Sequence, residues 1–228
     1  MDYWICGGKI VDFPLRTVDG KTVVTIKRNG NSIYTVVESD KTFVDIEKHW
    51  ARTDIELLSS KFLIKGIDEN TFAPDQLITR AQFATLLVQA LGLSENQAAA
   101  KFSDVNGKQW HAGYVGAAVE AKLVSGFSDG TYRPNDQITR EQMAVMVMNA
   151  VRFAGADLGS KGDSQKLLAK FQDQAKISQW AEKSVFEVLE AGIMSGVKTD
   201  IFSPADFASR AQAASIMKRM LVHLHFIN

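Results

Sequence analysis

The sequence predicts a mainly α-helical protein of three tandem helix–loop–helix repeats, packed as a pseudo-threefold trimer and preceded by a short antiparallel β-meander. One six-residue stretch occurs three times, beginning at Ile78, Ile138 and Ala208. Thirty residues before the arginine of each stretch stands a tryptophan, and the copies align from tryptophan to arginine without a gap. Like units of this length cannot bury their apolar faces alone, so we expect them to pack on one another. The repeated positions are Trp50, Trp110 and Trp180; Gly66, Gly126 and Gly196; Pro74, Pro134 and Pro204; and Arg80, Arg140 and Arg210.

Residues 1–41 differ in composition from the repeats that follow. Segments rich in β-branched residues alternate there with Asp19-Gly20 and Asn29-Gly30, which are strong hairpin signals. Three strands alone are marginally stable, so we interpret this segment as the end of an upstream β domain. The three expected strands are residues 9–13, 22–26 and 33–37.

The rest of the chain divides by the repeats. Each opens with an aromatic residue and an aspartate, continues with a helix that carries the tryptophan near its start, and ends with a loop and a second helix. The expected segments are residues 42–94 for the first repeat, 101–154 for the second, 155–170 for a glycine-containing linker, and 171–228 for the third.

Helix initiation explains part of the repeated stretch. Thr79 followed by Gln82 is a capping box, in which the hydroxyl and the glutamine side chain satisfy each other's backbone amides. The same pairs recur as Thr139/Gln142 and Ser209/Gln212. The arginine between them is not explained, because a cation at the first helical position opposes the helix dipole. An anion bound beside the helix N-terminus would compensate. The alternative is an intermodule salt bridge to the opening aspartates Asp45, Asp104 or Asp173.

Loop chemistry predicts one further feature. Asn70, Gly130 and Asp200 align across the three repeats, and all three residue types tolerate positive φ. We therefore expect a left-handed turn residue at this position.

Composition excludes several classes of function. The 228 residues include 26 basic and 26 acidic ones, and zero net charge argues against nucleic acid as the main partner. Cys6 is the single cysteine, which rules out an intramolecular disulfide, and no apolar run approaches the ~18 residues of a membrane span. We predict no catalytic constellation, cofactor or metal site in these residues. The first eleven residues lack a signal-peptide pattern. Either the chain stays inside the cell or it is the tail of a longer secreted protein, and we expect the second, with an upstream domain or passenger missing from this chain.

The repeats resemble the S-layer homology (SLH) domain. The resemblance rests on the opening Phe-x-Asp, on His49-Trp50-Ala51, on the loop of residues 126–134 and on Ile-Thr-Arg-Ala-Gln, in register over residues 43–224. It implies a three-pronged pseudo-trimer at the C-terminus of a Gram-positive, Bacillus- or Paenibacillus-like surface protein. It also implies noncovalent binding of secondary cell-wall polysaccharide, often with pyruvate ketals on N-acetylmannosamine, in grooves between modules.

The resemblance also suggests which residues bind. The motif arginines would pair with the ligand carboxylate and the tryptophans would cover a sugar face, or otherwise only shape the groove wall. The polar residues before the repeated glycines would donate to the ligand. The predicted ligand-binding set is Arg80, Arg140, Arg210, Trp50, Trp110, Trp180, Lys65, Ser125, Ser195, Gly66, Gly126 and Gly196. The third repeat departs most from the family pattern, so we expect a degenerate groove to involve it. The rival hypothesis is a protein–protein interaction module of the surface layer.

Overall fold

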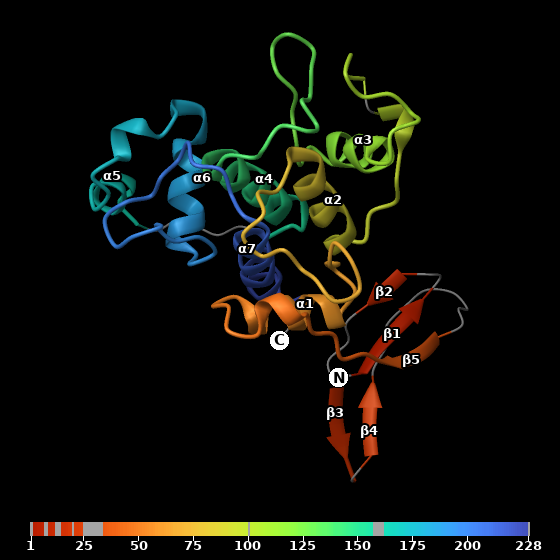
Figure 1. The fold of residues 1–228 in the computed structure, drawn as a ribbon. Helices are drawn as coiled ribbons and strands as arrows, with labels where there is room; N and C mark the ends of the chain where they lie inside the picture. Colours follow the sequence, from red (N-terminus) through yellow and green to blue (C-terminus); the bar gives the residue numbers. More distant parts are fainter. Residues whose placement is uncertain are drawn as a thin grey trace.

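The computed structural model describes residues 2–6, 9–11, 15–19, 21–24, 34–99, 101–156 and 162–227. Within these residues the fold is mainly helical, as predicted, and its three repeats surround a common axis (Figure 1). The α-helices are α1 (Arg52–Ser60), α2 (Arg80–Ala90), α3 (Ala112–Glu120), α4 (Arg140–Phe153), α5 (Ser164–Leu168), α6 (Gln179–Glu190) and α7 (Arg210–His223). Short 3₁₀ turns are η1 (Val44–Ile46), η2 (Gln97–Ala99) and η3 (Gln174–Lys176).

The predicted capping boxes are confirmed at all three second helices. Thr79 accepts from the amide of Gln82, while the Gln82 side chain accepts from the Thr79 amide. The equivalent pairs start α4 and α7. The repeated stretch therefore marks each helix start, as its sequence chemistry requires.

Helix pairing crosses the repeat boundaries. The second helices α2, α4 and α7 contact one another at the centre of the molecule. Each first helix packs on the second helix of another repeat: α3 on α2, α6 on α4, and α1 on α7 (Figure 1). Asp54 of α1 accepts a hydrogen bond from Ser215 of α7, which joins the first repeat to the last. Each packed pair thus combines two repeats, and the chain closes into a ring.

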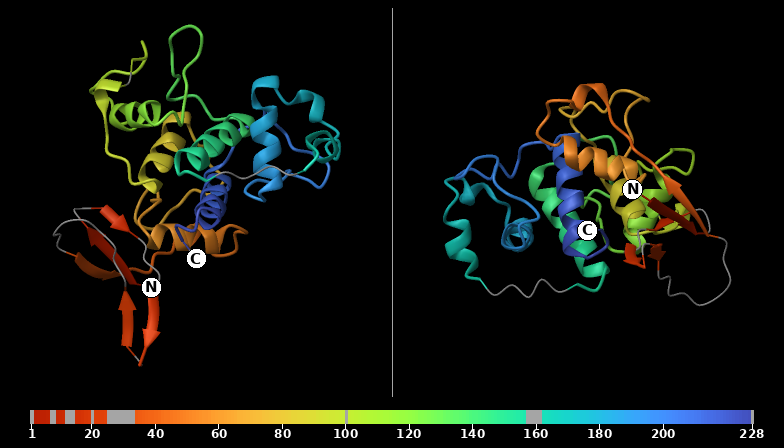
Figure 2. Two further views of the ribbon diagram at one scale, coloured as in Figure 1. Left: turned by 180° about the vertical axis from the view of Figure 1, so that it is seen from behind. Right: turned by 90° about the horizontal axis from the view of Figure 1, so that it is seen from below.

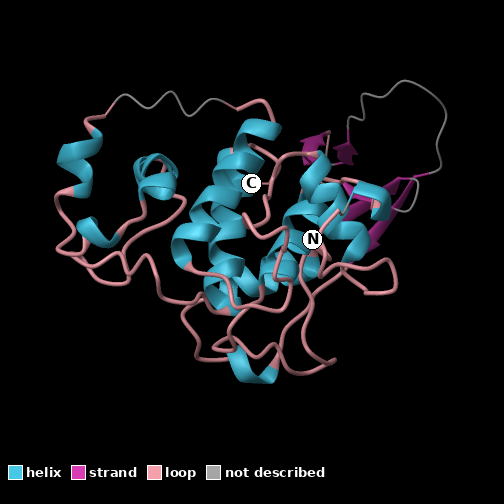
Figure 3. Ribbon diagram, turned by 90° about the horizontal axis from the view of Figure 1, so that it is seen from above, coloured by secondary structure: helices cyan, strands magenta, loops and turns pink. Residues whose placement is uncertain are grey.

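A triangle of backbone hydrogen bonds connects the three repeats. The Ile78 amide donates to the Ala208 carbonyl, Ala208 to Ile138, and Ile138 to Ile78, each over 3.0 Å. The segments before α2, α4 and α7 are therefore related by approximate threefold symmetry. Figure 3, seen from above, shows the helices with the loops that connect them.

An aspartate clamps the loop of each repeat. Asp104 accepts from the Tyr132 amide at 2.8 Å and the Arg133 amide at 2.7 Å. Asp45 and Asp173 hold the corresponding amides in their own repeats. The clamped aromatic residues Phe72, Tyr132 and Phe202 are fully or almost fully buried. These contacts hold the loop in place, and in the second and third repeats the same loop lines a cavity.

The left-handed turn prediction is correct only for Gly130, with φ +79°. Asn70 and Asp200 do not have positive φ. Within this loop the residue before the proline is left-handed in all three repeats, with φ +58° at Ala73, +57° at Arg133 and +56° at Ser203. The aspartate clamp binds the amide of this residue, which offsets the cost of the conformation.

The N-terminal strands project from the helical body (Figure 2). They form two small sheets, one in the order β2-β1-β5 and one hairpin, β3-β4. The expected single three-stranded meander is not confirmed, because β1 pairs with both β2 and β5. The Asn29-Gly30 signal lies outside the described residues. Strand bounds are β1 Asp2–Cys6, β2 Lys9–Val11, β3 Leu15–Val18, β4 Lys21–Val24 and β5 Tyr34–Glu38.

Among the described residues, no helix is both long and apolar enough to cross a membrane.

Candidate functional site

The three repeated tryptophans lie on the surface. Trp50 is 64% exposed, and Trp110 and Trp180 are each 59% exposed. Large aromatic residues are normally buried when they serve a core, so these three are not core residues. Their rings are available for contact.

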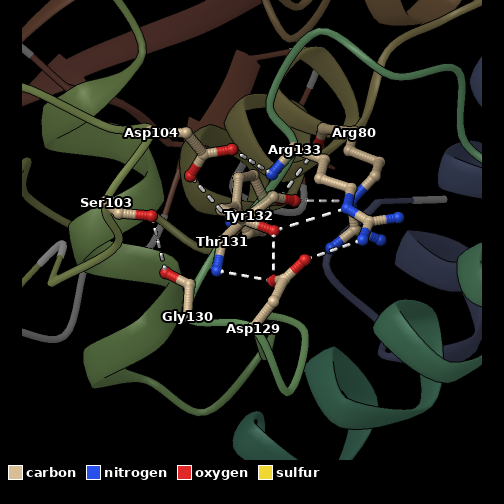
Figure 4. Close-up of polar contacts among 8 residues, drawn as sticks. All are labelled: Arg80, Ser103, Asp104, Asp129, Gly130, Thr131, Tyr132 and Arg133. Atoms are coloured by element: carbon tan, nitrogen blue, oxygen red, sulfur yellow. Dashed lines mark hydrogen bonds and ion pairs between the residues drawn. The ribbon is translucent and has the colours of Figure 1, made fainter.

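The repeated arginines bridge neighbouring repeats. Arg80 donates from Nε to the Tyr132 carbonyl at 2.9 Å (Figure 4). It also donates from Nη2 to the Ser125 carbonyl at 3.3 Å. The other two repeated arginines make the same two kinds of hydrogen bond to backbone carbonyls. Arg140 donates to the carbonyls of Phe202 and Ser195, and Arg210 donates to those of Phe72 and Lys65.

These contacts replace the salt bridges considered from the sequence. No ion pair within 4 Å joins a repeated arginine to an opening aspartate in the part of the chain that the structure describes. The aspartate and the arginine instead bind the backbone of the same loop residue: Asp104 accepts from the Tyr132 amide and Arg80 donates to the Tyr132 carbonyl (Figure 4). The arginines therefore hold repeats together through backbone carbonyls.

Burial leaves these guanidiniums poorly hydrated. Arg80 and Arg140 are 6% and 4% exposed, and desolvation lowers the pKa of all three arginines below the usual value. Each also lies over a clamped aromatic ring, at 4.8 Å from the centroid for Arg80 on Tyr132. A desolvated cation without a carboxylate partner favours an incoming anion.

The helix N-terminus itself is not free for an anion. The Arg80 amide donates to the Asp136 carbonyl at 2.9 Å, and the Ala81 amide donates to the Pro134 carbonyl at 3.0 Å. The Gln82 amide donates to Thr79. These amides are therefore not available to an anion, because carbonyls of the next repeat and the cap occupy them. An anion would meet the arginine side chain instead.

One cavity of about 320 Å³ lies between repeats beside Trp180, and we call it the Trp180 groove. It combines the tryptophan of the third repeat, the arginine of the first, and the loop and α4 of the second. Its lining residues are Arg80, Leu123, Val124, Ser125, Gly126, Phe127, Ser128, Gln142, Val145, Met146, Asn149 and Trp180.

A second cavity of about 290 Å³ is its rotational counterpart, and we call it the Trp50 groove. Here the tryptophan comes from the first repeat, the arginine from the second, and the loop and α7 from the third. Its lining residues are Trp50, Arg140, Ser195, Gly196, Val197, Gln212, Ser215, Ile216 and Arg219. The structure thus brings eight of the twelve predicted site residues together in two groups of four.

Four predicted residues remain. Lys65, Gly66, Trp110 and Arg210 are the repeat equivalents of the residues in the two grooves, and we call their place in the ring the third rotational position. Trp110 and Arg210 border neither of the two grooves. Lys65 and Gly66 line a hollow of about 420 Å³ together with Phe43 and Phe62. At this position Gln89 of α2 hydrogen-bonds Tyr114 of α3, with 3.5 Å between Nε2 and the phenol oxygen.

The repeated glycines have a steric reason of their own. A Cβ on Gly126 would lie 2.2 Å from the Phe102 ring and 2.6 Å from the Thr131 carbonyl oxygen. Gly66 and Gly196 are equally crowded. These glycines permit close packing of the loop, and two of them also border a groove.

Sequence reasoning missed the helical wall of each groove. Gln142 was interpreted only as a cap, and Asn149 and Arg219 were not singled out. The Trp180 groove also adjoins a hollow of about 470 Å³ that includes Phe127, Arg133 and Phe207. The signal for the wall is the helical spacing of residues 142, 145, 146 and 149, which places them on one face.

Comparison with known proteins identifies the family. The family model described as S-layer homology domain matches residues 42–84, 101–144 and 170–214. The chain belongs to the S-layer homology domain family. SLH domains in surface-layer and cell-surface proteins are noncatalytic modules that attach proteins to cell-wall polymers.

Individual relatives agree with this assignment. The chain is 32% identical over 203 residues to an amylopullulanase of Thermoanaerobacterium thermosulfurigenes, covering 87% of the chain and 10% of that protein. It is 33% identical over 203 residues to the exoglucanase XynX of Acetivibrio thermocellus, covering 89% and 18%. It is 29% identical over 186 residues to the S-layer protein sap of Bacillus anthracis, covering 81% and 22%. The chain therefore spans less than a fifth of the two enzymes.

Proposed function

We propose that this SLH chain is a noncovalent anchor that holds an attached protein at the cell wall. Its ligand is an acidic secondary cell-wall polysaccharide whose units include pyruvylated N-acetylmannosamine. The Trp50 and Trp180 grooves bind one acidic sugar unit each. The chain itself performs no catalysis, and an upstream passenger supplies any activity.

One observation carries the proposal. Each groove joins an exposed tryptophan, a desolvated arginine and an exposed serine, contributed by three different repeats. The indole face suits the apolar face of a sugar ring, and the serine suits its hydroxyl groups. The guanidinium suits the single carboxylate of a pyruvate ketal.

The arginine has donor capacity left for this role. Nε and Nη2 of Arg80 and Arg140 bind carbonyls, while Nη1 makes no hydrogen bond within the described residues. Because both side chains border their cavities, a carboxylate in the groove can reach this remaining donor. The fixed carbonyl bonds hold the guanidinium in place before the ligand arrives.

Two grooves on one chain make the attachment multivalent. A polymer presents many identical units, so binding in one groove raises the effective concentration of units at the other. Weak binding in each groove then gives firm attachment to the wall.

The test is calorimetry with purified wall polysaccharide, before and after chemical removal of pyruvate. We expect binding to native polymer, loss of binding after depyruvylation, and loss in a Trp50→Ala/Trp180→Ala double variant. Phe153→Ala is the control, because Phe153 is an exposed aromatic residue outside both grooves. Equal binding to both polymers would contradict the proposal. Binding to surface-layer protein instead of polysaccharide would favour the rival protein–protein module.

A further inference from the structure

The two grooves differ in charge at one helical position. Asn149 of α4 lines the Trp180 groove, and Arg219 of α7 occupies the equivalent place in the Trp50 groove. Both residues lie nine positions after the repeated arginine of their helix. A single substitution within the repeat therefore changes one wall of the groove.

Asn149 is neutral and held in place. Its Nδ2 donates to the Leu123 carbonyl at 3.2 Å, and its Oδ1 accepts from Arg152 at 3.3 Å. Arg219 is exposed, and its side chain makes no hydrogen bond or ion pair with the described residues. The preceding residue, Lys218, does not line the groove and pairs with Asp54 at 3.5 Å.

The two grooves differ in the number of ionised side chains that line them. The Trp50 groove has two guanidiniums, those of Arg140 and Arg219, and none of its lining residues is a carboxylate. The Trp180 groove has one guanidinium, that of Arg80, and likewise no lining carboxylate. Arg133 borders only the adjoining hollow, and Asp129 neutralises it across 2.8 Å.

We infer that Arg219 makes the Trp50 groove selective for a sugar segment that carries two negative charges, whereas the Trp180 groove takes a segment with one. This rests on the proposed function. Arg140 meets the first carboxylate with its remaining donor, and Arg219 meets the second with its free planar fork. A second carboxylate on the ligand does not raise affinity for the Trp180 groove, because the equivalent residue there, Asn149, carries no positive charge.

The experiment isolates each groove and compares two probes. Trp180→Ala leaves the Trp50 groove, and Trp50→Ala leaves the Trp180 groove. One probe is the methyl glycoside of pyruvylated N-acetylmannosamine, with a single carboxylate. The other is the same unit linked to glucuronate, with two carboxylates. Calorimetry gives the ratio of the two dissociation constants for each single-groove protein.

We expect the Trp50 groove to prefer the dicarboxylate by about threefold to tenfold, as for one charge-assisted contact at a partly exposed site. Arg219→Asn should remove this preference, because it weakens binding of the dicarboxylate more than binding of the monocarboxylate. Asn149→Arg should create it in the Trp180 groove. Lys170→Asn, an equal change of net charge on an exposed residue outside both grooves, should alter neither ratio.

Equal ratios in both grooves, or a ratio that survives Arg219→Asn, would overturn the inference while leaving the proposed function intact. Failure of both grooves to bind the monocarboxylate would instead overturn the proposed function. Raised salt should reduce the preference more than the monocarboxylate affinity, because the Arg219 contact is exposed and therefore screened.

Discussion

The Trp50 and Trp180 grooves share an arginine and a tryptophan at equivalent positions, which we call the frame residues, and differ in other lining residues. In both, an arginine from the preceding repeat binds two loop carbonyls, and a tryptophan from the repeat that follows in the ring lines the cavity. The lining differs: Phe127 and Asn149 in one groove correspond to Val197 and Arg219 in the other. The frame residues maintain the ring of repeats, while the lining residues can change without disturbing it.

This contrast assigns different jobs to residues that the repeat pattern treats alike. Arg80 is buried and joins two repeats, whereas Trp180 is exposed and packs into no core. Substituting the arginine should therefore disturb folding, and substituting the tryptophan should disturb only binding.

The largest effect should come from Arg80→Ala. It removes two hydrogen bonds from a charged donor and leaves the Tyr132 carbonyl buried without its partner, at a cost of about 3–5 kcal/mol in the free energy of unfolding. Urea denaturation followed by circular dichroism measures this loss. Trp180→Ala is the control and should cost no more than ~1 kcal/mol. An Arg80→Ala protein with unchanged stability and no ligand binding would reassign the arginine to the ligand alone.

Gly126→Ala should have the next largest effect. The new methyl group would overlap the Phe102 ring and the Thr131 carbonyl, and overpacking of this kind costs about 1–3 kcal/mol. Gly107→Ala is a matched control, because the nearest atom to its added Cβ is a flexible side-chain oxygen at 3.4 Å. Denaturation midpoints compare the two. If both variants were equally stable, the repeated glycine would need a reason other than packing.

The smallest effect should be a pH dependence at the third rotational position. His111 is buried beside Trp110 where the other repeats have Ala51 and Ala181, and its Nδ1 lacks a partner in the described protein. Desolvation lowers the His111 pKa below its usual value of 6.5, so folding favours the neutral ring. Stability is therefore complete above the unfolded pKa and falls as pH drops below about 6.5, where the unfolded chain binds the extra proton.

His111→Ala tests this directly. The variant should lose part of the decline in denaturation midpoint between pH 7.5 and pH 5. A decline of the same size in the variant would place the titrating group elsewhere.

The sequence was sufficient for the repeat architecture and the helix starts, because both depend on local chemistry. The Thr79–Gln82 box forms as its spacing requires. Helix pairing between repeats could not be predicted in this way, since pairing within a repeat would preserve the same spacing and the same apolar faces. The partners of the arginines were equally hidden, because every residue carries a carbonyl and carbonyl acceptors leave no signature in the sequence.

Two smaller discrepancies have similar causes. The loop residue that is left-handed in every repeat is Ala73, Arg133 or Ser203, and these residue types give no warning of positive φ. The aspartate clamp from elsewhere in the repeat stabilises the conformation. The exposure of the tryptophans depends on where α6 and α1 pack, so it too required the tertiary structure. Gln142 lines a groove and also caps a helix, and the capping role alone accounted for its presence.

The most direct test of the two-groove account is the stoichiometry of a single sugar unit. Titration with the methyl glycoside of pyruvylated N-acetylmannosamine should give two sites on the unaltered chain. Trp50→Ala and Trp180→Ala should each leave one site, and the double variant should leave none while retaining its fold by circular dichroism. Two sites that persist in the double variant, or a site lost only when an arginine is removed, would contradict the account.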